Sequence, residues 1–166
     1  TSNNLIVPYD FPHYVAPAGN PTRAQRVVQM LTGQTRFAVD DFARMQADNF
    51  NIPGAHMAKR VRPVQPETEL GRQARDILSG WDGYHKPENA AGAVYETLRW
   101  KLFDATLGRL HTWMPDPKPS AESLRSYMTA VLGMIESDDR ELLSHEALPF
   151  DDWDVPLAEA LDAAAE

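Results

Sequence analysis

The 166-residue sequence contains no cysteine. Disulfide bonds, cysteine nucleophiles and cysteine-ligated zinc sites are therefore excluded from this chain. Its longest apolar runs fall well short of the roughly 20 residues that a membrane-spanning helix requires, so no membrane span is predicted. The five histidines include no pair three or four residues apart, and no EF-hand spacing is present. We therefore predict no metal and no cofactor bound by this chain alone.

Positive charge is also scarce. The sequence has 16 Lys and Arg against 24 Asp and Glu, which gives a formal net charge of -8. Binding to nucleic acid or to anionic membrane surfaces requires clustered positive charge, so neither is predicted. The glycine-rich phosphate-binding loops of nucleotide-binding proteins are missing as well.

The residues that are present indicate a mainly α fold. Apolar spacing and capping residues predict helices, which we place at residues 22–33, 39–48, 66–79, 90–110, 120–137 and 155–166. No period-2 strand of useful length is found. We expect a strand end and a Pro-rich loop over residues 1–20, followed by an irregular helical domain over residues 21–166. That domain should contain about six helices joined by Pro-rich connections.

The apolar faces of these helices predict the core. In the helix over 90–110, Val94, Leu98, Leu102 and Ala105 form one stripe, which marks it as a central helix. The other apolar positions predicted to face inward are Val27, Met30, Leu31, Phe42, Met45, Leu70, Ala74, Ile77 and Leu78. The "GWDG" stretch at residues 80–83 is predicted to be structural, with Trp81 packed between helices and Asp82 capping the loop.

A complete active site is not visible in these residues. Ser79 lacks the G-x-S-x-G elbow of serine hydrolases. Thr1 offers an alternative hypothesis, because an N-terminal threonine can use its own amine as a base. That chemistry normally sits in a two-layer sheet sandwich, which this sequence cannot build. The chain also starts without Met and ends at Ala-Ala-Ala-Glu without a helix cap, so we expect it to be a segment of a longer protein.

Four motifs in order carry a resemblance to a known family. They are Thr1-Ser2-Asn3-Asn4 with the following "YDFPHY", Arg23-Ala24-x-Arg26-Val27, Met45-Gln46-Ala47-Asp48, and the stretch from Leu78 to Gly83 before a long helix. Together they resemble the penicillin amidase (penicillin acylase) family of N-terminal-nucleophile hydrolases. The similarity covers residues 1 to about 110, and beyond "HTWMPDPKPS" it rests on helical character alone.

The resemblance implies a fold, an activity and two site residues. It implies that the chain is a helical part of the β-chain of a larger αββα hydrolase, which we call the parent amidase. The family hydrolyses linear amides with an N-terminal serine exposed by autoproteolysis, and that serine lies outside this chain. The oxyanion-hole asparagine of the family falls on Asn3, and the arginine that orients it and the nucleophile's amine falls on Arg23.

The resemblance also bears on partners and cofactors. The implied partners are the remainder of the parent amidase and a small N-acyl amide substrate, and the implied location is periplasmic or secreted. Some family members bind calcium through an acid after the Tyr-Pro loop, but here that position lies near the apolar Val15, while Asp10 precedes the Phe-Pro. Calcium in the parent amidase is therefore not expected to be held by this loop. The alternative function is a stand-alone helical interaction module without catalysis.

Overall fold

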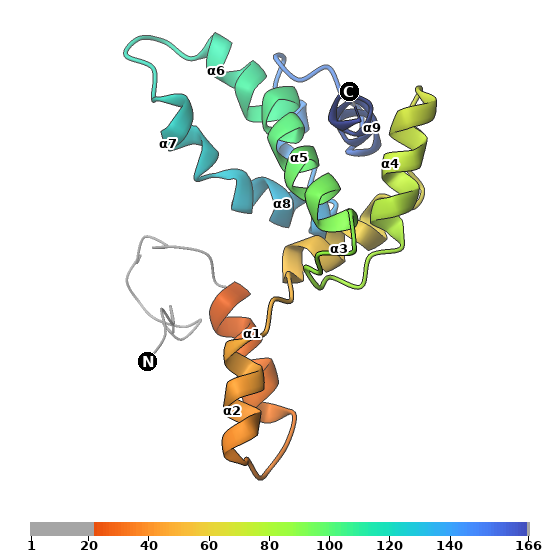
Figure 1. The fold of residues 1–166 in the computed structure, drawn as a ribbon. Helices are drawn as coiled ribbons and strands as arrows, with labels where there is room; N and C mark the ends of the chain where they lie inside the picture. Colours follow the sequence, from red (N-terminus) through yellow and green to blue (C-terminus); the bar gives the residue numbers. More distant parts are fainter. Residues whose placement is uncertain (1–21, 166) are drawn as a thin grey trace. The chain divides into compact units, whose positions relative to one another are not determined.

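The computed structural model describes residues 22–165, and every regular element in this range is helical. The α-helices are α1 Thr22–Thr32, α2 Val39–Gln46, α3 Ile52–Arg60, α4 Glu69–Ser79, α5 Ala91–Phe103, α6 Arg109–Trp113, α7 Ala121–Arg125, α8 Met128–Ser137 and α9 Asp154–Ala164. A π-helical segment, η1 Asp104–Gly108, and a 3-10 turn, η2 Glu141–Ser144, complete the set (Figure 1). The mainly α prediction is confirmed for residues 22–165. None of the helices described is long and apolar enough to cross a membrane.

The described helices outnumber the six or so that were predicted, because α3 was not among the predicted helices and two predicted helices are interrupted. The helix predicted over 120–137 breaks between α7 and α8 at Ser126 and Tyr127. The central helix continues from α5 through η1 into α6, and its π-helical segment coincides with a hydrogen bond from the Thr106 hydroxyl to the Leu102 carbonyl (2.6 Å). A side chain that bonds back to the helix backbone in this way competes with the regular ladder.

The chain divides into two units, residues 1–52 and residues 53–166. The larger unit holds the hydrophobic core, in which α5 packs against α4 and α9. The most deeply buried apolar side chains, each less than 2% exposed, are Trp153, Tyr95, Leu78, Leu98, Leu102, Ile135, Leu148, Leu157, Leu161, Val61 and Val64. The predicted central stripe is confirmed, since Leu98, Leu102 and Ala105 are buried and Val94 packs against the core.

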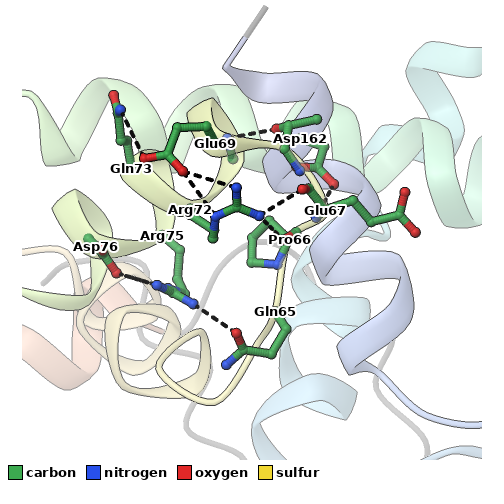
Figure 2. Close-up of polar contacts among 11 residues, drawn as sticks. Gln65, Pro66, Glu67, Glu69, Arg72, Gln73, Arg75, Asp76 and Asp162 are labelled. Atoms are coloured by element: carbon green, nitrogen blue, oxygen red, sulfur yellow. Dashed lines mark hydrogen bonds and ion pairs between the residues drawn. The ribbon is translucent and has the colours of Figure 1, made fainter.

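The start of α4 is fixed by a residue far away in the sequence. We predicted that this helix begins at Pro66, but it begins at Glu69 with Thr68 as its N-cap. The Asp162 carboxylate, from α9, accepts hydrogen bonds from the backbone N–H groups of Glu67 and Thr68 (both 3.0 Å) and from the Thr68 hydroxyl (2.6 Å). Figure 2 shows this cluster. Because Asp162 takes the N–H groups of residues 67 and 68, the helix starts after them.

Two further observations describe the same cluster. Burial acts to raise the pKa of Asp162, but its hydrogen bonds to Thr68 and the backbone outweigh this and hold the pKa below the ordinary value of 3.8. Arg72 donates to the carbonyl oxygens of Pro66 (3.2 Å) and Glu67 (2.7 Å) and pairs with Glu69 (3.0 Å; Figure 2). The loop before α4 is thus held by α9 on one side and by α4's own arginine on the other.

Gly71 leaves the space that this cluster needs. A Cβ atom at position 71 would collide with Asp162 Oδ1 and would lie 2.9 Å from Pro66 Cβ and Thr68 Oγ1. We expect Gly71→Ala to lower the free energy of unfolding by about 1–3 kcal/mol, measured by urea denaturation. Gly133→Ala in α8 is the matched control, because nothing lies within 4 Å of a Cβ there. It should be neutral or stabilise by about 1 kcal/mol, and equal effects at both positions would refute the steric argument.

The "GWDG" turn has the structural role predicted for it. Trp81 is 6% exposed, donates from Nε1 to the Tyr84 carbonyl (2.9 Å) and packs against the Tyr95 ring at 5.6 Å between centroids. The Asp82 carboxylate accepts from the Tyr84 N–H (3.0 Å). Gly83 has φ of 87°, a left-handed conformation that disfavours residues with a side chain. Trp81 therefore joins the end of α4 to the central helix.

Candidate functional site

The smaller unit contains the one predicted site residue that the structure describes. Arg23 lies in the first turn of α1, where a cation opposes the helix dipole, and its side chain is exposed. Within residues 22–165 it has no ion-pair partner. Asn3 lies outside the described residues. The structure therefore confirms that Arg23 opens a helix, while the pairing of Arg23 with Asn3 stays a prediction.

A bidentate ion pair joins α1 to the segment that follows α2. Arg26 donates from Nε to Asp48 Oδ2 (2.8 Å) and from Nη2 to Asp48 Oδ1 (2.7 Å). The side chains of Arg26 and Asp48 are 21% and 12% exposed. A planar guanidinium that meets a carboxylate with two parallel bonds fixes both position and orientation. This pair holds the first turns of α1 beside the end of α2.

The surroundings of this pair favour its ionised form. The hydrogen bonds from Arg26 are the largest cause that lowers the pKa of Asp48 below its ordinary value of 3.8, and they outweigh burial, which acts to raise it. The guanidinium carbon of Arg26 lies 4.5 Å from the centroid of the Phe50 ring. Stacking on an aromatic face suits the weakly hydrated guanidinium.

Arg26 and Asp48 both belong to the sequence motifs, but the motifs did not predict that the two residues form an ion pair. Arg26 belongs to the Arg23-Ala24-x-Arg26-Val27 motif, and Asp48 ends the Met45-Gln46-Ala47-Asp48 motif. The ion pair thus brings together two of the four motifs that carry the family resemblance. Opposite charges in the two neighbouring helical segments were the available signal. The turn between the helices had to be known before Arg26 could be paired with Asp48.

The start of α2 is closed by a local contact. The Asp41 carboxylate accepts a hydrogen bond from the Ala38 N–H (2.6 Å), and this bond is the main cause that lowers the pKa of Asp41. Asp40 and Asp41 both lie in the first turn, where negative charge complements the helix dipole. These contacts fix where α2 begins and so how the chain returns toward Arg26.

Within residues 22–165, the contacts described above position side chains. No group of three or more His, Asp or Glu able to hold a metal ion occurs among them. Arg26 is paired with Asp48, whereas the side chain of Arg23, one turn earlier on α1, is exposed. An exposed guanidinium on an anchored helix can bind an amide oxygen or a carboxylate.

Comparison with known proteins gives the context for this site. The profile of the family described as "Penicillin amidase" matches residues 1–166. The penicillin acylase 2 proenzyme of Pseudomonas sp. (strain SE83) is 27% identical over 175 residues, which cover 100% of this chain and 22% of that protein. The chain thus spans about a fifth of the length of this relative.

The family match extends over the whole chain, including the region after residue 110 where the sequence motifs gave no specific signal. The two motifs joined by Arg26 and Asp48 are two of the four on which the resemblance was based. On these grounds the chain belongs to the penicillin amidase family.

Proposed function

We propose that this chain is part of a longer amidase, the parent amidase, which hydrolyses a linear N-acyl amide bond with an N-terminal serine located outside these residues. The observation that carries the proposal is the family match over residues 1–166, together with a relative whose length the chain spans only to 22%. That relative is named a proenzyme, which supports maturation by cleavage of a precursor. Removal of a segment in front of a serine would expose its amine and its hydroxyl together.

In the proposed mechanism the serine hydroxyl attacks the acyl carbonyl, and its own α-amine accepts the proton. The Asn3 side-chain N–H donates to the oxyanion of the tetrahedral intermediate, where a preorganised neutral donor contributes roughly 3 kcal/mol. Arg23 holds the Asn3 amide in place and, by its positive charge, keeps the nearby amine unprotonated. The proton on the α-amine then passes to the amide nitrogen, so that the C–N bond breaks, the amine product leaves and the acyl group stays on the serine. The freed α-amine next takes a proton from water, which attacks the acyl-enzyme ester and releases the carboxylic acid and the serine hydroxyl. The exposed Arg23 side chain on the anchored α1 helix supports this role.

The remaining features of the proposal come from the family resemblance. The parent amidase is proposed to be periplasmic or secreted and to act on a small N-acyl amide, with β-lactam side chains, acyl-homoserine lactones and other N-acyl amides all open as substrates. Calcium, where the parent amidase binds it, is proposed to be held outside this chain. The described residues offer no cluster of acids for it.

The 166-residue chain alone is expected to be predominantly helical and to hydrolyse no amide, because the nucleophile is missing. Incubation with chromogenic phenylacetyl and fatty-acyl anilides measures this directly, with heat-inactivated protein as the control. Turnover that disappears in Thr1→Ala would instead support the hypothesis of a free-standing hydrolase that uses Thr1.

A further inference from the structure

The two helices of the smaller unit keep apolar side chains in the open. On α1, Val28 is 50% exposed and Leu31 is 42% exposed. On α2, Val39 is 85% exposed and Phe42 is 48% exposed. Leu31 and Phe42 were predicted to face inward, and for both the prediction is wrong, as it is for Leu70 and Ile77 on α4. We call Val28, Leu31, Val39 and Phe42 the hairpin apolar set.

The hairpin of α1 and α2 has almost no core of its own. Ala24 is the one buried residue in α1, and α2 has none among its eight residues. Met30 and Met45, which line a shallow open hollow between the two helices, are only half-buried. Every member of the described hydrophobic core lies between Met57 and Leu161. Polar contacts such as the Arg26–Asp48 pair therefore contribute much of what joins the two helices.

A hairpin of this kind needs another apolar surface to pack against. Two short helices without a shared core are marginal in water, and most helical stability comes from packing of the apolar face. Four exposed, large apolar residues within fifteen positions also form the kind of surface that marks an interface. The Arg26–Asp48 ion pair holds α1 and α2 together and leaves the hairpin apolar set exposed for contact with another surface.

We infer that the hairpin apolar set docks onto an apolar surface of the parent amidase that lies outside these 166 residues. The inference rests on the proposed function. The length of the relative supports this choice of docking surface, because the relative is a longer protein of which this chain spans 22%. Covalent continuity makes such a surface available at high effective concentration. Docking would at the same time fix α1, the helix that carries Arg23, relative to the rest of the enzyme.

Photo-crosslinking in the full-length parent amidase tests the inference. Phe42 is replaced by the photoreactive analogue benzoylphenylalanine, and Leu31 is replaced in a second variant in case the first disturbs folding. Asp40 is the matched control, because it is exposed on the opposite side of α2 from Phe42. After irradiation, the crosslinked peptides are identified by mass spectrometry.

We expect Phe42 and Leu31 variants to crosslink to parent peptides outside the 166 residues, and the Asp40 variant to give no such products. Crosslinks to residues 1–21 or 53–166 would overturn the inference, because the covering surface would then lie within this chain. A product of twice the mass would overturn it in favour of a second copy, and no crosslink from either position, or equal crosslinking from Asp40, would also overturn it. The readout needs no turnover, so it is independent of whether Asn3 and Arg23 act in catalysis.

Discussion

Asn3→Ala in the full-length parent amidase is expected to lower kcat by roughly 100-fold or more while KM moves little. The physical reason is that the Asn3 N–H meets a full negative charge only in the transition state. If the same oxyanion hole serves autoproteolysis, the Asn3→Ala precursor should also mature slowly. Steady-state kinetics on an N-acyl anilide and the ratio of precursor to mature chains on a gel measure the two effects.

Arg23 is proposed to hold the Asn3 amide, so the loss of kcat on replacing Arg23 should not add to the loss on replacing Asn3. The double variant Asn3→Ala/Arg23→Ala is expected to lose about as much kcat as Asn3→Ala alone, because residues that act as a unit are non-additive. Arg23→Lys should recover little of the loss in Arg23→Ala, since a single ammonium cannot replace the two-pronged guanidinium.

Arg26 provides the internal control for this prediction. Arg26→Ala leaves Asp48 without its bidentate partner, so we expect a lower melting temperature and a loss of kcat much smaller than that caused by Arg23→Ala. Arg26→Ala could instead abolish kcat with an unchanged melting temperature while Arg23→Ala leaves kcat unchanged. The role proposed for Arg23 would then belong to Arg26, one turn later on α1. If Asn3→Ala and Arg23→Ala both reduce only thermal stability, the assignment of either residue to the site must be withdrawn.

Trp81→Ala is expected to lower the free energy of unfolding of the larger unit by about 3–5 kcal/mol. The indole is buried between the end of α4 and Tyr95 of α5, and its N–H is satisfied by the Tyr84 carbonyl, so truncation leaves a cavity and an unpaired carbonyl. Urea denaturation followed by far-ultraviolet circular dichroism measures the loss.

Trp113→Ala is the matched control for Trp81. The Trp113 side chain is 56% exposed and makes an edge contact with His145 at 6.2 Å between ring centroids. Its removal should cost no more than about 1.5 kcal/mol, the upper range for an aromatic pair. A loss at Trp81 no larger than the loss at Trp113 would show that the "GWDG" turn does not anchor the fold.

Local sequence pattern was sufficient to predict most of the helices, but it predicted neither α3 nor the helix ends. The central helix was predictable because Leu98 and Leu102 recur at helical spacing on a buried face. Its π-helical segment was not, because the apolar spacing over residues 104–108 does not distinguish a π-helical turn from an α-helical one. The start of α4 was misplaced for a different reason. Asp162, some 94 positions away, decides which backbone N–H groups are capped.

The site was predictable only in part, and for a similar reason. Arg23 stands at the start of a helix as the motif indicated, whereas the Arg26–Asp48 pair depends on a turn between helices that no periodicity encodes. The inward direction predicted for Phe42 failed because an amphipathic pattern shows that a face will be covered without showing by what. For a segment of a larger protein, the cover can lie outside the segment.

The most direct test of the account is the identity of the chain ends in the purified, active full-length protein. Intact-mass measurement and N-terminal sequencing should find two chains. The chain that contains these 166 residues should begin with a serine, upstream of Asn3. Replacing that serine with alanine should leave one uncleaved, inactive precursor. A single uncleaved chain that hydrolyses N-acyl anilides at an undiminished rate would contradict the N-terminal-nucleophile mechanism, and with it the roles proposed for Asn3 and Arg23.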